Sequence, residues 1–198
     1  YPRVNLTIKQ GSPAAIAQMV SNGEADIAIV TERIDDHPEL SKLTCDEWNH
    51  AVIVPKEHPL LECMNPLSIE DLASFPLITY EFAFNQGSSI ARAFNKAHLD
   101  NPDVVLSAAD TDVLKTYVRL GLGVGLMAKM AFDPEKDADL ELVDAAHLFE
   151  PSPIWIAVRS DTYLRGYTYD FIEMFSPKLT RDVVDRILYT PVVEDFSI

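Results

Sequence analysis

Two hydrophobic periods alternate along the chain, one typical of strands and one typical of helices. Short alternating or continuous apolar runs predict strands at residues 4–8, 25–30, 51–54, 76–80, 104–106, 123–127 and 154–158. Apolar residues at helical spacing predict helices that begin at Ser12, at Ser68, at Ser88 or Ser89, and at Asp110, each residue a good N-cap. Two more helices are predicted at 163–175 and 179–188. This alternation indicates an α/β fold with largely parallel sheets. Its first part is a β–α–β unit over residues 4–31.

Three helix starts combine small polar side chains with backbone N–H groups that a helix leaves free. They lie at Ser12, in the stretch 85–89 and at Thr111. Such groups bind small anions or carboxylates, and ligands of open α/β sheets lie beyond the carboxyl ends of the strands. Simple capping is the alternative for each start. Asp110 and Asp112 favour capping at the third, because carboxylates repel an anion.

Other polar and aromatic residues have two possible interpretations each. Thr31 ends the apolar strand at 25–30, so it either faces such a pocket or is an ordinary strand-end threonine. Trp48 and Trp155 lie where the alternating pattern shifts. They are either core residues or residues near a hinge between two lobes.

Composition and charge exclude several classes of function. The 198 residues carry a net charge of −15, so this chain by itself is not expected to hold DNA, although the acidity also serves solubility. Cys45 and Cys63 form no CxxC pair, and two free thiols, which suit a reducing cytoplasm, are expected in preference to the alternative of a single disulfide. No apolar run reaches the roughly 18 residues of a membrane span. No signal peptide is visible, and a start at Tyr1 without Met indicates a fragment of a longer protein.

The chain shows no pattern typical of an enzyme. The five histidines lack metal-ligand spacing, and no nucleophile or phosphate-loop motif is present. The run 121–125, Gly-Leu-Gly-Val-Gly, looks like a nucleotide loop but follows a predicted helix, so it predicts a tight helix-to-strand turn. We therefore expect no catalysis, no cofactor and no metal.

Several longer segments carry a family resemblance. They are residues 46–50 (Asp-Glu-Trp-Asn-His) with 57–60 (Glu-His-Pro-Leu), 76–80, 93–95, 116–125 and 163–184. Together they resemble the effector domain of LysR-type transcription regulators, in the form of the CysB/Cbl subfamily. The resemblance covers nearly the whole chain except the last dozen residues, and the run at 163–184 is not a general LysR feature.

The resemblance implies a fold and a function. The fold is α/β, with two Rossmann-like lobes joined by two crossover strands, like a type 2 periplasmic binding protein. Lobe I would be residues 1–47 plus 150–198 and lobe II residues 48–149, with a ligand cleft between them. The function implied is sensing of a co-inducer for sulfur assimilation and cysteine biosynthesis, with acetylserine, sulfate or thiosulfate as ligands. The intact protein would be a cytoplasmic homotetramer that binds promoter DNA through an N-terminal domain.

The family's ligand residues carry over only in part. Thr31 matches an anion-contacting threonine, and Asn85 replaces another. Ser12 is kept, but Ala14 and Ala15 replace the Thr-Gln that follows it in the family. The resemblance also implies a Thr-x-Thr-Gln loop upstream of residue 1, so the ligand site of this chain is expected to be incomplete. The candidate ligand residues are Ser12, Thr31, Asn85, Gln86 and Thr111.

Two other functions remain to be compared with this one. A solute-binding protein of a transporter shares the implied fold, and fold analogy alone cannot choose between the two. An α/β enzyme is the third possibility, but it would need a catalytic constellation that the sequence does not show.

Overall fold

The computed structural model describes residues 1–31, 37–63 and 66–189, and the chain divides into two units. Unit 1 consists of Tyr1–Asp46 and Pro153–Ile198, and unit 2 of Glu47–Ser152, so the chain passes between the units twice. Both passages lie within strands, β2 (Leu40–Trp48) and β8 (Ser152–Arg159). In the described part of the chain, no helix has the length and apolar character needed to cross a membrane.

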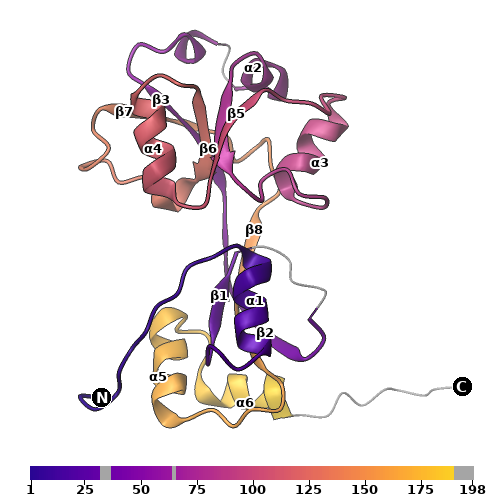
Figure 1. The fold of residues 1–198 in the computed structure, drawn as a ribbon, viewed down its shortest axis with the longest axis vertical. Helices are drawn as coiled ribbons and strands as arrows, with labels where there is room; N and C mark the ends of the chain where they lie inside the picture. The colour runs from indigo at the N-terminus through magenta and orange to yellow at the C-terminus, as the bar shows by residue number, and fades with distance from the viewer. Residues whose placement is uncertain (32–36, 64–65, 190–198) are drawn as a thin grey trace, which may run out of the picture. The chain divides into compact units, whose positions relative to one another are not determined.

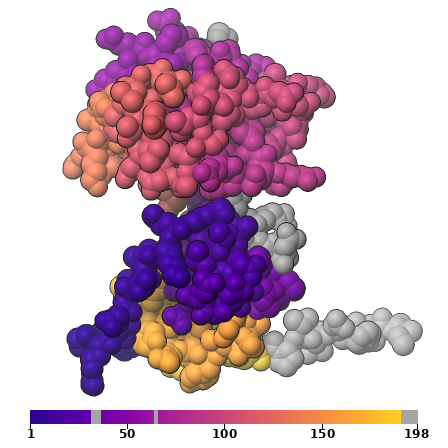
Figure 2. All heavy atoms as spheres, viewed as in Figure 1, coloured from indigo at the N-terminus to yellow at the C-terminus, as the bar shows by residue number. Residues whose placement is uncertain are grey.

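Unit 1 is built on a three-stranded sheet of order β1-β8-β2, with β1 at Ala28–Val30. β8 runs antiparallel to β1, with Ile29 opposite Ile156. Three helices accompany the sheet: α1 (Pro13–Ser21), α5 (Gly166–Phe175) and α6 (Arg181–Tyr189). Ala17 and Val20 of α1 pack into a small core with residues of β1 and β8. Figure 2 shows the indigo start of the chain against the orange residues of the last third, consistent with a hydrogen bond from the Tyr1 hydroxyl to Asp170.

The strand predicted at residues 4–8 is not formed, so that prediction was wrong. Residues 4–8 have no strand structure, and the side chains of Leu6 and Ile8 are 72% and 78% exposed. A strand needs a neighbour to take its backbone hydrogen bonds, and none of the described strands pairs with this segment. The predicted β–α–β unit is therefore reduced to α1 and β1. The helix itself is confirmed, since Ser12 caps α1 and Gly23, at φ 75°, follows its end.

Unit 2 is built on a five-stranded sheet of order β5-β4-β6-β3-β7. Figure 1 labels β3, β5, β6 and β7 of this sheet. The strands are β3 (His50–Pro55), β4 (Leu77–Tyr80), β5 (Val104–Ala108), β6 (Val124–Ala128) and β7 (Leu140–Asp144). β4 is parallel to β5 and β6, whereas β3 is antiparallel to β6 and β7. The prediction of largely parallel sheets is thus corrected to mixed sheets. A continuous apolar run such as β3 indicates burial on both faces but does not specify strand direction.

The helices of unit 2 enclose a core that lies within this unit. They are α2 (Ile69–Ala73), α3 (Ser89–Lys96) and α4 (Thr111–Arg119), with 3-10 turns η1 (Pro59–Glu62) and η2 (Lys129–Ala131). α4 packs against strands β3 to β6 and buries Leu114 and Val118. Phe94 of α3 is also buried in this core. The helix starts predicted at Ser68, Ser88 and Asp110 are confirmed, because each residue is the N-cap of its helix.

The glycine run at 121–125 is a helix-to-strand turn, as predicted. Gly121 follows the end of α4 at φ 74°, a left-handed conformation that favours glycine. A Cβ on Gly123 would lie 2.5 Å from the carbonyl oxygen of Pro76, and one on Gly125 would lie 2.6 Å from Ile53 Cγ1. These glycines therefore allow close packing of α4, β4 and β6, and no phosphate is needed to explain them.

Candidate functional site

In unit 1, two of the predicted ligand residues, Ser12 and Thr31, lie at the same end of the helix α1 and the strand β1. The chain runs along α1 and returns along β1, which packs against it, so the start of the helix and the end of the strand are neighbours. Ser12 is the N-cap of α1, and its Oγ accepts a hydrogen bond of 3.3 Å from the backbone N–H of Ala15. Thr31 follows the last residue of β1 and is half-buried. The first turn of α1 has no acidic residue, so the positive end of its dipole is not neutralised there.

In unit 2, the loops that follow two parallel strands lie at one edge of the sheet. β4 leads into the loop before α3, and β5 leads into the start of α4. The hydroxyl of Tyr80, at the end of β4, lies 2.9 Å from Thr111 Oγ1, at the start of α4. The sequence pattern did not single out Tyr80, because the contact joins residues that are 31 positions apart.

The start of α3 has unused hydrogen-bonding capacity. Ser88 Oγ donates to the carbonyl oxygen of Ala83 and accepts a 3.0 Å hydrogen bond from the N–H of Ala91. Ser89 is 6% exposed, and its Oγ has no hydrogen-bond partner. The side chains of Asn85 and Gln86 are exposed in the preceding loop, and the first turn has no acidic residue. A small anion or carboxylate would therefore meet several hydrogen-bond donors and no acidic residue in the first turn of the helix.

The start of α4 differs from the other two. A carboxylate oxygen of Asp110 accepts hydrogen bonds from the backbone N–H groups of Asp112 and Val113, at 2.8 and 3.4 Å. The helix end is thus capped by a negative charge, which repels an anion. Ser12 and the stretch 85–89 fit an anion site better than Thr111 does, and Thr111 as a ligand residue stays a prediction.

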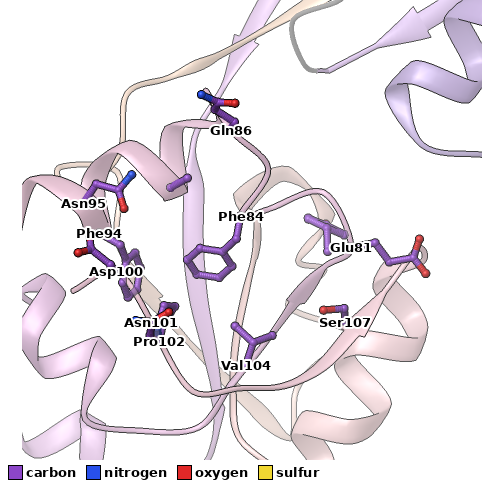
Figure 3. A pocket seen from close by; sticks show the side chains of 12 residues that line it. Glu81, Phe84, Gln86, Phe94, Asn95, Asp100, Asn101, Pro102, Val104 and Ser107 are labelled. Atoms are coloured by element: carbon purple, nitrogen blue, oxygen red, sulfur yellow. The ribbon is translucent and has the colours of Figure 1, made fainter. Parts of the chain in front are cut away.

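A cavity of about 490 Å³ lies in unit 2 beside α3, the loop after β4 and β5 (Figure 3). Figure 3 shows Phe84 in the middle of the lining, with Asn95 and Asp100 on one side and Glu81 on the other. Gln86 also borders this cavity, so one predicted ligand residue belongs to it. Lining residues are Tyr80, Glu81, Phe84, Gln86, Ala91, Phe94, Asn95, Asp100, Asn101, Pro102, Val104 and Ser107. The sequence pattern did not indicate this cavity, because its walls come from β4, α3, β5 and the loops that join them.

The two tryptophans lie just after the points where the chain passes between the units. Trp48 ends β2 and is buried, with its ring 4.3 Å from the imidazole of His50. Trp155 lies in β8, and the Nζ of Lys42 is 5.7 Å from the centre of its ring. The core-packing interpretation is confirmed for Trp48. The half-buried Trp155 packs at the edge of the small core of unit 1.

The two thiols and the acidic side chains were the remaining candidates for special chemistry in the sequence. Cys45 and Cys63 are free cysteines, as predicted, and burial raises the pKa of the Cys45 thiol. Across residues 1–31, 37–63 and 66–189, no group of three His, Cys, Asp or Glu side chains is arranged to hold a metal ion.

Comparisons with known sequences identify a matching family. The family model described as the LysR substrate binding domain matches residues 1–180. The HTH-type transcriptional regulator CysB of Burkholderia cenocepacia is 48% identical over 188 residues, which are 95% of this chain and 59% of that protein. The HTH-type transcriptional regulator cbl of Klebsiella aerogenes is 39% identical over 200 residues, which are 100% of this chain and 63% of that protein. The chain therefore spans about three fifths of the length of these relatives.

Solved structures show the same fold. The cofactor-binding domain of the Cbl transcriptional regulator has a TM-score of 0.84 and 37% identity, over 96% of this chain and 83% of that one. The effector binding domain of QuiR, solved in complex with shikimate, has a TM-score of 0.71 over 86% of this chain and 81% of that one. At 17% identity, the second likeness concerns the fold alone.

Proposed function

The chain belongs to the LysR substrate binding domain family, and from that premise we propose that it is the effector-sensing part of a transcription regulator of the CysB/Cbl type. The fold of this family is α/β with mixed sheets, similar to type 2 periplasmic binding proteins. The observation that carries the proposal is identity of 48% across 95% of the chain with a CysB regulator.

The proposed effectors are acetylserine and the anions sulfate and thiosulfate. The names of the relatives, CysB and cbl, support an effector from sulfur metabolism. The candidate contacts support an anionic group, because Ser12 and Thr31 in unit 1 and Asn85 and Gln86 in unit 2 are polar but uncharged. Hydrogen bonds and helix N-termini would hold the ligand, so both a dianion and a zwitterion would be tolerated.

Calorimetry on this chain tests the effector proposal. Sulfate, thiosulfate and the acetylserines would each be titrated into the unmodified chain and into the variants Ser12→Ala, Thr31→Ala and Asn85→Ala. Loss of one hydrogen bond, worth about 0.5–1.5 kcal/mol, should weaken binding by roughly 2- to 12-fold. Thr116→Ala is the control, because Thr116 is exposed and its hydroxyl donates only within α4, to Asp112. Equal affinity in all variants would place the effector elsewhere.

The relatives distinguish this proposal from the alternative of a transport protein. Solute-binding proteins share the fold, but the matching relatives are named as transcriptional regulators and not as transporters or enzymes. We accordingly propose that the chain binds its effector without turning it over. Hydrolysis of O-acetylserine by purified chain, lost on a single substitution, would contradict this.

DNA binding is proposed for the intact regulator and not for this chain alone. The relatives are named HTH-type regulators, and the chain spans only about three fifths of their length. We propose that a separate domain of a cytoplasmic homo-oligomer binds the promoter. At a net charge of −15, residues 1–198 should repel DNA and give no specific mobility shift at physiological salt. A shift that discriminates a cysteine-gene promoter from random DNA of equal length would contradict the expectation.

A further inference from the structure

The cavity beside α3 has aromatic walls and an acidic rim. The rings of Phe84 and Phe94 meet edge to face at 5.2 Å, and Phe94 is 1% exposed, so this wall is anchored in the core of unit 2. Val104 of β5 and Ala91 of α3 add further apolar lining. The lining also includes the acidic residues Glu81 and Asp100, which are both exposed and lie on opposite sides of the cavity (Figure 3). A volume of about 490 Å³ is in the range typical of small-molecule sites.

The charges around this cavity favour a cation over an anion. The residues that line the cavity include two acidic residues and no Lys or Arg. Neither Glu81 nor Asp100 forms an ion pair with any described residue. Arg92, also on α3, is engaged with the carbonyl oxygen of Gly87 and with Glu150 Oε2, the latter at 2.7 Å. The faces of aromatic rings attract cations, and the net charge of −15 adds to the negative potential.

We propose that this cavity is a second ligand site, which takes a small organic cation: an amine carried on a compact apolar body. The apolar body would lie against Phe84 and the ammonium would face the rim, near Glu81 or Asp100. The starts of α1 and α3 have the opposite preference, because each of them offers hydrogen-bond donors to an anion. The second site does not rest on the proposed function, although the exposed Gln86 borders both regions.

Three probes of one shape and different charge test the proposal: benzylamine, benzyl alcohol and benzoate. Each would be titrated into isotope-labelled chain at neutral pH and low salt and followed by amide NMR. Two rim carboxylates should make benzylamine bind at least about tenfold more tightly than benzoate, with benzyl alcohol between them. Signals of Phe84, Ser107 and the side-chain amides of Asn95 and Asn101 should shift. Equal binding of the three probes, or shifts confined to another surface, would overturn the proposal.

Charge variants distinguish the contribution of the acidic rim to binding from that of the apolar walls. The double variant Glu81→Gln with Asp100→Asn should remove the preference for benzylamine and leave binding of benzyl alcohol unchanged. Glu70→Gln is the matched control, because Glu70 is an exposed carboxylate of unit 2 outside the cavity, and it should preserve the preference. A preference that survives the double variant would overturn the proposal. Sulfate, one of the proposed effectors, should not displace benzylamine at constant ionic strength. Absence of sulfate binding would contradict only the effector proposal, and absence of benzylamine binding would contradict only the proposal of a second site.

Discussion

At the start of β3, the imidazole of His50 lies between two aromatic rings, 4.3 Å from that of Trp48 and 5.1 Å from that of Phe149. The residue is 2% exposed, and its Nδ1 has no hydrogen-bond partner. Burial disfavours the charged imidazolium and lowers the pKa of His50 to about 4. The unfolded chain would bind a proton at this group near pH 6.5, its ordinary value.

We expect His50 to make the stability of the fold depend on pH. Its folded-state pKa is lowered, so between pH 6.5 and 4 the unfolded state binds the proton and the folded state does not. Neutral His50 therefore carries no such penalty above pH 6.5. As the pH falls from 6.5 to 4, the free energy of unfolding should decrease by about 3 kcal/mol. Urea denaturation at several pH values measures this change.

His50→Phe keeps an aromatic ring between Trp48 and Phe149 but cannot take up a proton. Relative to the unmodified chain, this variant should lose less stability between pH 6.5 and 4. His98→Asn is the control, because His98 is exposed and its φ of 60° is a conformation that asparagine tolerates. Identical pH profiles for His50→Phe and the unmodified chain would show that His50 is not responsible.

A buried ion cluster joins α4 to the segment after η2. Asp137 is 2% exposed and accepts hydrogen bonds from Lys115 Nζ at 2.6 Å and from Arg119 Nη2 at 2.8 Å. The backbone N–H of Asp133 also donates to it. Burial acts to raise the pKa of Asp137, but these hydrogen bonds outweigh it and hold the pKa below the usual value. One carboxylate thus orients two cationic side chains of the helix.

Asp137→Asn should lower the free energy of unfolding by about 3 kcal/mol, because it leaves the buried Lys115 ammonium without its counter-charge. Asp144→Asn is the matched control, because it breaks an ion pair with Lys129 that is about half exposed and should change stability by less than about 1 kcal/mol. Chemical denaturation measures both variants. In the unmodified chain, the stability from ionised Asp137 is lost as the pH falls below 3.8. Equal effects of the two substitutions would contradict the role of Asp137.

At the scale of the whole molecule, the two units differ in how the chain builds them. Every strand pair of the five-stranded sheet lies within unit 2, and so does its hydrophobic core, from Val52 to Phe149. Unit 1 combines two separate stretches of the chain, since its sheet places β8 between β1 and β2. Unit 2 is therefore the continuous part of the protein that buries its own apolar surface.

Residues 47–152 expressed alone should fold. Their sheet needs no strand from elsewhere, so we expect dispersed amide NMR signals and a single cooperative thermal transition. Residues 1–46 alone should not fold, because β8 is missing from the middle of their sheet. A molten spectrum for residues 47–152 would show that unit 2 depends on contacts with the rest of the chain.

The sequence alone predicted the strands and helices that local rules specify. The helix starts at Ser12, Ser68 and Ser88 follow from capping chemistry within three residues of each cap. The pattern missed β2 and β7, in which buried and exposed residues do not alternate regularly. It also predicted a strand at 4–8, where the alternation is clear but no neighbouring strand takes up the backbone hydrogen bonds.

By itself, the sequence determined the α/β class, the helix starts, the glycine turn at 121–125 and, through longer motifs, the family resemblance. These are properties of neighbouring residues, because helical periods, caps and turns are set within a few positions of the chain. Only the tertiary structure decided the direction of the strands, the contact of Tyr80 with Thr111, the cavity at Phe84 and the ion cluster at Asp137. Each depends on residues distant in sequence, whose approach is fixed by packing of the whole core and not by any local pattern.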